Sequence, residues 1–223
     1  MASGSSSWVT PRAAKGARMS IEDSRGFSRA QRDFADALVA QRDARAVLRH
    51  AEQWHTQMGA VNIVTALHRI AKHEDAEEVL DDSMFLSLGA SIPSLARSGA
   101  VDPRGLANTA WAFASIAFLD GPLMDAIAAA AIRKISEFYG QSVSNMAWSI
   151  ARLCLLDSPL IASLSAQALR RISDLASQDL SNIAWAYSPI SLRHEPLMEA
   201  ISAASLRRLQ DFSPQDIANS SWA

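Results

Sequence analysis

The sequence predicts an all-α protein, an α-solenoid built from 37-residue helix-turn-helix repeats. One phrase recurs along the chain as "LANTAWAFA", "VSNMAWSIA", "LSNIAWAYS" and "IANSSWA", and its tryptophans, Trp111, Trp148, Trp185 and Trp222, are each 37 residues apart. Of the 223 residues, 49% are apolar. Runs of β-branched residues bounded by Gly and Pro are missing, which favours helices over strands. A fixed period of this length is typical of stacked helical units that cover one another's apolar faces.

Several other positions keep the same period, so nothing is inserted or lost between the regular units. Prolines recur 37 residues apart, and so do asparagines and pairs of basic residues. These positions are Pro122, Pro159 and Pro196; Asn108, Asn145, Asn182 and Asn219; and Arg133-Lys134, Arg170-Arg171 and Arg207-Arg208.

Each unit divides into a first helix, which holds the repeated phrase, and a second helix. In the third unit, Ser177 or Asp179 is expected to cap the first helix. Pro196 suits the first turn of the second helix, because its missing N–H would have no partner there anyway. Leu197 and Ile201 then share one side at helical spacing. Helices this short are marginally stable alone, so we expect stacking to supply the stability.

Upstream of residue 103 the pattern weakens but continues. "NIVTALHRIA" resembles "NTAWAFASIA" at an offset of 46 residues, so about nine additional residues lengthen one connection near the acidic run 74–82, for which we expect a solvated loop. Further upstream, apolar residues mark one long or two short amphipathic helices that cover the open end of the stack. The first 20 residues contain serines and basic residues but no acid, as in a transit peptide or a disordered tail.

These observations predict a domain organisation in three parts. Residues 1–26 form a disordered or transit-like tail, residues 27–60 an N-terminal capping helix, and residues 61–223 the α-solenoid. The solenoid itself comprises a degenerate repeat at 61–102, regular repeats at 103–216 and a truncated repeat at 217–223.

The composition and motifs give no support to catalysis. The five histidines include no pair at metal-ligand spacing, and Gly-rich phosphate loops and nucleophile elbows are missing. Cys154 lies in the apolar run "ARLCLL", where we expect a buried core residue. No apolar stretch approaches the ~20 residues that cross a bilayer. We therefore expect no enzyme, no metal, no cofactor and no membrane partner.

Two sets of side chains are candidates for binding nucleic acid. The formal charge of −2 excludes a strongly basic protein, so such binding requires local patches. The basic pairs Arg133, Lys134, Arg170, Arg171, Arg207 and Arg208 lie near the ends of the second helices, where they either follow a phosphate backbone or stay solvated and complement the helix dipole. The second set, Thr109, Met146, Ile183 and Arg152, varies between units, as a base-by-base reader requires; relaxed packing also produces such variation.

We interpret the repeated asparagines and tryptophans as a structural seam between units. An asparagine side chain is expected to hydrogen-bond the backbone of the adjacent turn, and a tryptophan to pack beside the Ala-rich helices. The alternatives are a ligand contact for asparagine and base stacking for tryptophan. The seam comprises Asn108, Trp111, Asn145, Trp148, Asn182, Trp185, Asn219 and Trp222.

The helix pair carrying "LSNIAWAYS" and "PLIASLSAQALRRISDL" resembles the heptatricopeptide and octotricopeptide repeats of organellar RNA-binding proteins. These include the FAST-kinase-like and RNA-editing substrate-binding complex families, and the resemblance covers about residues 61–223. It implies a non-catalytic solenoid that binds single-stranded RNA and supports RNA processing, stability or ribosome assembly. It also implies other proteins of a ribonucleoprotein assembly as partners, and a mitochondrial or chloroplast location, with the cytoplasm as the alternative.

Two features depart from these families. The RAP domain that often ends their chains does not follow here, and the near-neutral charge differs from their basic character. The competing interpretation is a protein-interaction scaffold of the armadillo or HEAT type, in which the basic pairs are ordinary surface.

Overall fold

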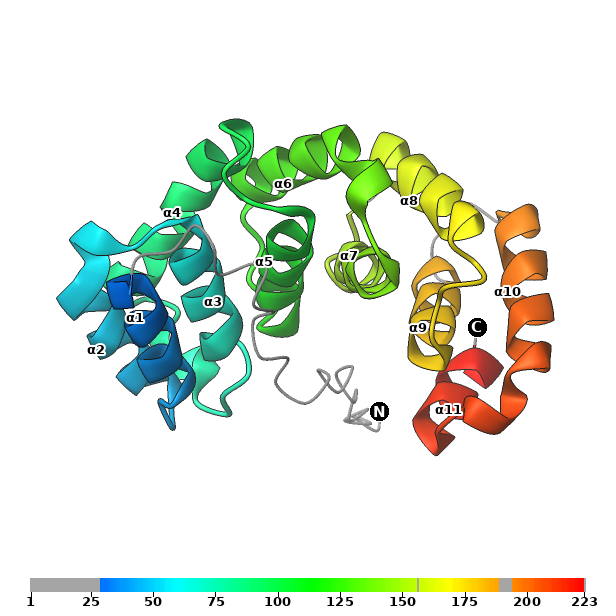
Figure 1. Ribbon diagram of the computed structural model, residues 1–223, viewed down its shortest axis with the longest axis horizontal. Helices are drawn as coiled ribbons and strands as arrows, with labels where there is room; N and C mark the ends of the chain where they lie inside the picture. The colour runs from blue at the N-terminus through cyan, green and yellow to red at the C-terminus, as the bar shows by residue number, and fades with distance from the viewer. Residues whose placement is uncertain (1–28, 156, 189–193, 223) are drawn as a thin grey trace, which may run out of the picture.

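The computed structural model describes residues 29–155, 157–188 and 194–222, and every regular element in this part of the chain is a helix. Its eleven α-helices form an arch of two layers (Figure 1). The predicted all-α solenoid is therefore confirmed. The predicted tail at residues 1–26 lies outside the described residues, as does the side chain of Trp222.

First helices line the inside of the arch and second helices its outside (Figure 1). Neighbouring inner helices pack directly on one another, and from α5 onward they begin 37 residues apart. The inner helices are α3 (Ala60–Ile70), α5 (Pro103–Ser115), α7 (Gly140–Arg152), α9 (Ser177–Tyr187) and α11 (Pro214–Trp222). The outer helices are α4 (Ser83–Arg97), α6 (Gly121–Arg133), α8 (Ser158–Arg170) and α10 (Glu195–Arg207).

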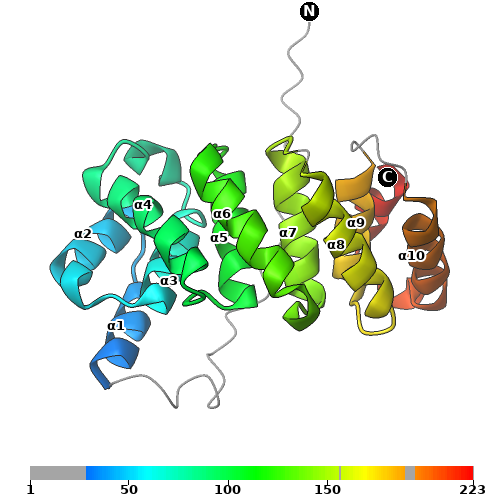
Figure 2. The same cartoon turned by 90° about the horizontal axis from the view of Figure 1, so that it is seen from above.

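Two helices, α1 (Arg29–Val39) and α2 (Ala44–Trp54), cover the N-terminal end of the arch (Figure 2). The acidic connection after α3 exposes most of its acids, as we expected for a solvated loop, but part of it packs against these two helices. Its short 3₁₀ helix (Ala76–Val79) buries Ala76 and Val79. The carboxylate of Asp75 accepts hydrogen bonds from the backbone N–H groups that begin α2, which ties this connection to the capping helices.

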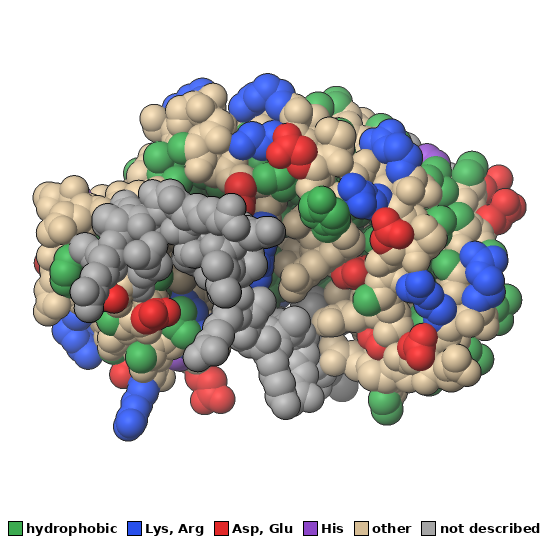
Figure 3. Space-filling view, in the orientation of Figure 1, with side chains coloured by type: hydrophobic (Ala, Val, Ile, Leu, Met, Phe, Trp, Pro, Cys, Tyr) green, Lys and Arg blue, Asp and Glu red, His purple; other side chains and the backbone are tan. Residues whose placement is uncertain are grey.

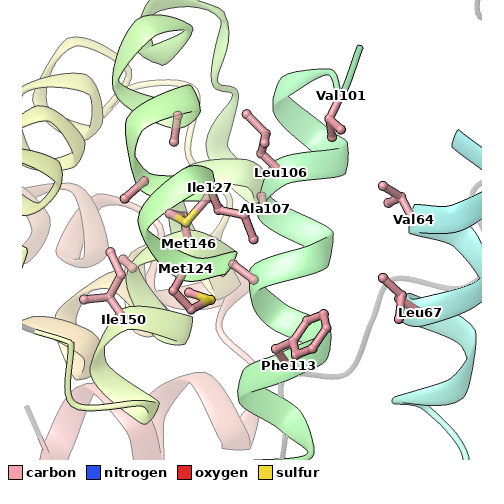
Figure 4. Close-up of a cluster of buried hydrophobic side chains, with 14 of the residues drawn as sticks. Val64, Leu67, Val101, Leu106, Ala107, Phe113, Met124, Ile127, Met146 and Ile150 are labelled. Atoms are coloured by element: carbon pink, nitrogen blue, oxygen red, sulfur yellow. The ribbon is translucent and has the colours of Figure 1, made fainter. Parts of the chain in front are cut away.

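The main core lies between the two layers and continues along the whole arch. Leu106 and Phe113 of α5 point into it together with Val64 and Leu67 of α3 (Figure 4). Each large side chain buried in this way stabilises the fold by about 1.5–3 kcal/mol. Since every short helix contributes only a few, the units depend on their neighbours for stability.

Short polar side chains define the beginnings of the outer helices. Asp120 and Asp157 accept hydrogen bonds from backbone N–H groups in the first turns of α6 and α8, at 3.0 and 2.9 Å. His194 plays the same part in α10, where Pro196 lies in the first turn as predicted. Asp179 caps α9 from within, because its carboxylate accepts from the N–H of Ala176 at 3.2 Å.

The inner helices α5 and α7 both end on a residue in the left-handed region, Ala117 with φ 52° and Cys154 with φ 54°. The backbone N–H that follows Ala117 bonds back to the carbonyl of Phe113, which closes the last turn of α5. Cys154 is exposed at the equivalent turn of α7. Our expectation of a buried core cysteine was wrong, since the helix ends before this residue turns inward.

Candidate nucleic-acid interface

A column of aromatic rings runs along the inner layer. The indoles of Trp111 and Trp148 lie 6.4 Å apart between ring centroids, as do those of Trp148 and Trp185. Trp111 and Trp148 share a small buried cluster with Ala112 and Ala114, separate from the main core. Because the indoles of Trp111 and Trp148 are only 4% and 7% exposed, these rings join unit to unit and offer little area to a base.

Polar side chains occupy the remaining positions on the same side of each inner helix. In α5, Arg104, Asn108 and Ser115 share the face of Trp111, opposite to the core residue Leu106. The even-numbered helices cover the core side, so this face looks into the arch. We call it the concave stripe; it comprises Arg104, Asn108, Gln141, Asn145, Arg152, Gln178, Asn182, Gln215 and Asn219.

The asparagine amides of the concave stripe do not tie adjacent turns as we predicted. Asn108 and Asn145 are half-buried, Asn182 is buried, and their side chains make no hydrogen bond to any residue that the structure describes. Other side chains join the units instead, as described below. The amides of Asn108 and Asn145 therefore keep donors and acceptors that an extended ligand can use.

Arg104 and the glutamines of the concave stripe were not among the site residues predicted from the sequence. Gln141, Gln178 and Gln215 each precede a stripe asparagine by four residues and recur every 37 residues. That spacing places them one helical turn away on the same face. The periodicity was therefore a sufficient signal, although the glutamines lie outside the repeated phrase.

Cations gather at the N-terminal end of the concave stripe. The imidazole of His68 packs against the indole of Trp111, with ring centroids 5.1 Å apart. Burial lowers the pKa of His68 to about 3, with further contributions from the charges of Lys72, Arg69 and Arg104. His68 is thus neutral at physiological pH, whereas the three surrounding cations create a positive field that attracts phosphate groups.

The positive charge continues into an open depression between α2 and the end of α3. Arg42, Arg45, Arg49 and Lys72 contribute to its lining. The carboxylate of Asp75, also in the lining, accepts bonds from the backbone of α2, and these bonds lower the pKa of Asp75 against the opposing effect of burial. Asp43 and Glu74 line the depression as well, so its four cations face three acids and its excess of positive charge is small.

The second residue of a basic pair joins neighbouring units in two of the three units. Lys134 Nζ donates hydrogen bonds to the carbonyls of Gly99 and Val101, at 2.9 and 2.8 Å. Arg208 donates to the carbonyls of Ser173, at 2.7 Å, and Leu175, which are the equivalent positions two units later. These cations satisfy the backbone of the preceding turn, so they are structural.

The middle unit makes the same connection with a different residue. The amide of Gln167 donates to the carbonyls of Ser136 and Phe138, at 3.3 and 2.8 Å. Arg171 is thereby released, and its guanidinium lies 4.5 Å from the centroid of the Tyr139 ring.

The first residues of the pairs remain on the surface, at the ends of the outer helices. Arg133, Arg170 and Arg207 are all exposed, although Arg133 donates one bond of 3.2 Å to a carbonyl of the preceding unit and Arg170 bonds to Gln167 at 3.0 Å. Acidic residues follow each pair with the same period: Glu137, Asp174 and Asp211. In Figure 3, small basic and acidic groups are interspersed on the visible face, without a continuous basic strip. This edge offers three exposed arginines rather than a ladder of six free cations.

Thr109, Met146 and Ile183 do not line any open surface. Their exposed fractions are all 0%, because each faces the core side of its inner helix. The prediction that these three side chains contact bases is therefore wrong, because a base could reach them only if neighbouring helices separated. Among the variable first-helix positions that we proposed, Arg152 is exposed and belongs to the concave stripe.

The described residues include no group of three or more His, Cys, Asp and Glu side chains arranged to hold a metal ion. Among the helices of this part, none has the length and apolar character needed to span a membrane.

Fold and surface together define a helical-repeat protein with a polar concave face backed by stacked indoles. Its residues 32–221 match the family described as RNA-editing substrate-binding complex 6 protein, and the chain belongs to that family. This match confirms the resemblance seen in the repeated phrase. The chain is also 35% identical, over 95 residues, to a "RAP domain-containing protein, chloroplastic" of Oryza sativa subsp. japonica. That alignment covers 38% of this chain and 14% of the relative.

Proposed function

We propose that this protein binds single-stranded RNA of a mitochondrion or chloroplast along the concave stripe. In this role it supports RNA processing, stability or ribosome assembly as a non-catalytic component of a ribonucleoprotein assembly. The family and the chloroplast relative support the organelle and the RNA ligand. The observation that carries the proposal is the repeated row of amides and arginines on the inner helices.

Each unit offers chemistry that suits an unpaired nucleotide. The amides of Asn108 and Asn145 can donate to and accept from base edges, which are open in single-stranded RNA. Arg104 and Arg152 are exposed on the same face and can neutralise phosphates. At about one base per helical unit, the four inner helices from α5 to α11 would cover about four nucleotides.

The exposed arginines of the outer edge, Arg133, Arg170 and Arg207, are proposed as additional phosphate contacts. Because acidic residues alternate with them, we assign them a smaller share of the binding than the concave stripe. Each phosphate contact that is lost should make the slope of log K against log salt shallower by about 0.7.

The test compares two double variants of equal charge change. Arg104→Ala/Arg152→Ala removes cations from the concave stripe, and Arg133→Ala/Arg207→Ala removes them from the outer edge. We expect the first to weaken binding of a labelled single-stranded RNA at least tenfold by fluorescence anisotropy, and the second to act mainly through the salt slope. Unchanged RNA binding in both variants, or no binding by the wild type, would overturn the proposal in favour of a protein-interaction scaffold.

A further inference from the structure

One aromatic side chain stands out on the edge of the arch. Tyr139, directly before α7, is 66% exposed. The equivalent positions of the other units hold Asp102, Ala176 and Ser213, so the aromatic ring belongs to one unit of the described repeats. A ring this exposed contributes little to the core, and the fold gives no reason for it.

Tyr139 packs against Arg171, a cation that the repeat pattern would place on the carbonyls of the preceding unit. Lys134 and Arg208, the equivalents of Arg171, both reach back to carbonyls of the preceding unit. In the middle unit Gln167 donates to those carbonyls, and the corresponding residues of the neighbouring units, Ala130 and Ala204, have no donor on their side chains. Gln167 therefore positions Arg171 indirectly, by occupying the acceptors that Arg171 would otherwise use.

Further contacts hold the released guanidinium at this place. Arg171 Nη1 lies 3.4 Å from a carboxylate oxygen of Asp174, and the side chain of Arg171 is 28% exposed. The guanidinium carbon is 4.5 Å from the centroid of the Tyr139 ring. Arg170 is exposed beside it, and Gln141 of the concave stripe follows Tyr139 by two residues. The Tyr139–Arg171 pair thus adjoins Arg170 in the sequence, whose Nε donates to Gln167 at 3.0 Å and whose side chain is exposed.

We propose that Tyr139 and Arg171 form a stacking site for one unpaired RNA base, with Arg170 contacting the adjacent phosphate. The inference rests on the proposed function. Tyrosine rings and guanidinium planes are the groups on which proteins stack splayed-out bases. Because stacking accepts any base and occurs in one unit, the site anchors one nucleotide of the strand at this unit without selecting its identity.

The decisive variants change the ring, its partner or the residue that positions the partner. Tyr139→Leu should weaken binding of a single-stranded RNA roughly tenfold, in the range of one lost base–aromatic stack, and Tyr139→Phe should retain it. Gln167→Ala changes neither Tyr139 nor Arg171 themselves, yet should weaken binding similarly, because Arg171 can then turn to the carbonyls of Ser136 and Phe138. Since this variant also removes the acceptor of Arg170, Arg170→Ala is measured beside it to separate the two effects. Leu206→Ala, which shortens another exposed apolar side chain, is the control.

A second readout locates the contact directly. RNA carrying a photoreactive 5-iodouridine should crosslink to Tyr139 in the wild type, and the crosslink should weaken in Gln167→Ala, with circular dichroism confirming that each variant is folded. RNA binding that survives in Tyr139→Leu, but is lost in Arg104→Ala/Arg152→Ala, would overturn the stacking site and leave the proposed function intact. Equal losses in Tyr139→Leu and Leu206→Ala would also overturn it. A wild-type chain that binds no RNA would overturn both.

Discussion

The hydroxyl of Ser144 on α7 donates a hydrogen bond of 2.8 Å to the carboxylate of Asp179 on α9. One unit later, Ser181 makes the same contact with Asp216 of α11, at 3.2 Å. Both serine–aspartate pairs are separated by 35 residues, so the repeat period brings each hydroxyl onto the acid of the next inner helix. These contacts tie the inner layer at its polar border, where the predicted asparagine bonds are missing.

Asp179 should make the stability of the fold depend on pH. Burial raises its pKa above 3.8, against the bonds from Ser144 and the Ala176 N–H, and the charge of Asp216 acts in the same direction as burial. The native state then holds this proton more tightly than the unfolded chain. The stabilising contribution of Asp179 is present below pH 3.8 and is lost as pH rises through the raised native pKa.

The measurement is the difference in unfolding free energy between wild type and Asp179→Asn, from urea titrations at several pH values. We expect this difference to decrease as pH rises from below 3.8. A difference in unfolding free energy that does not change with pH would contradict the assignment.

His68 should act with the opposite sign. Its native pKa of about 3 lies below the ordinary histidine value of 6.5, so the unfolded chain binds the proton first. Stability is therefore fully present above pH 6.5 and is lost as pH falls toward 3, by at most about 1.4 kcal/mol per pH unit. His68→Phe keeps a ring against Trp111 and should remove this slope in urea unfolding. If the unfolding free energy of the variant still falls with pH in this range, groups other than His68 cause the pH dependence.

A buried hydroxyl network should contribute to the stability of the third unit. The Tyr187 hydroxyl donates to the carbonyl of Ile161 at 3.0 Å and accepts from Ser165 at 2.9 Å, while burial raises the pKa of Tyr187 to about 12. Tyr187→Phe should destabilise the protein by about 1 kcal/mol. Ser165→Ala should lower the unfolding free energy less in the Tyr187→Phe background than in the wild type. A double-mutant cycle of thermal or urea unfolding measures this difference. Strictly additive losses would mean that the two hydroxyls act independently.

The left-handed backbone at Cys154 predicts a stabilising substitution. An L-residue at φ 54° is strained, whereas glycine adopts this conformation freely. Cys154→Gly should raise the free energy of unfolding by up to about 1 kcal/mol, and Ala117→Gly should do the same at the equivalent turn. Cys154→Val should be destabilising, because a β-branched side chain tolerates positive φ poorly. Stabilisation by valine would refute the backbone explanation.

Gln167 takes the structural contact that Lys134 makes in the preceding unit, so Lys134→Met and Arg171→Met should differ in their effect on stability. Lys134→Met leaves the carbonyls of Gly99 and Val101 without their donor and should lower the unfolding free energy by about 1 kcal/mol. Arg171→Met removes a cation at the equivalent position that holds no such carbonyls, so its effect should be much smaller. The urea midpoints of unfolding of the two variants, each compared with the wild type, check this prediction. Equal losses of unfolding free energy would show that Lys134 and Arg171 have the same structural role.

Much of the architecture could be predicted because it repeats. The spacing of Trp111, Trp148 and Trp185 and the placement of Pro196 depend only on local helix geometry, and both match the structure. The burial of Thr109 was also within reach of the sequence, since it lies three residues after the core residue Leu106. Variation between units is therefore a weaker indicator of exposure than the helical face on which a residue lies.

The amino-acid sequence is sufficient to establish the helices, their order and their pairing, because each of these follows from periodicity and from the residues at helix ends. Whether a basic residue bonds a backbone carbonyl or remains at the surface depends instead on contacts between units. Whether Lys134 or Gln167 reaches a carbonyl is decided by side chains about 30 residues apart that meet only when the layers stack. The Tyr139–Arg171 pair is a consequence of that contact, because the carbonyls of Ser136 and Phe138 accept from Gln167 and leave Arg171 to pack on the Tyr139 ring.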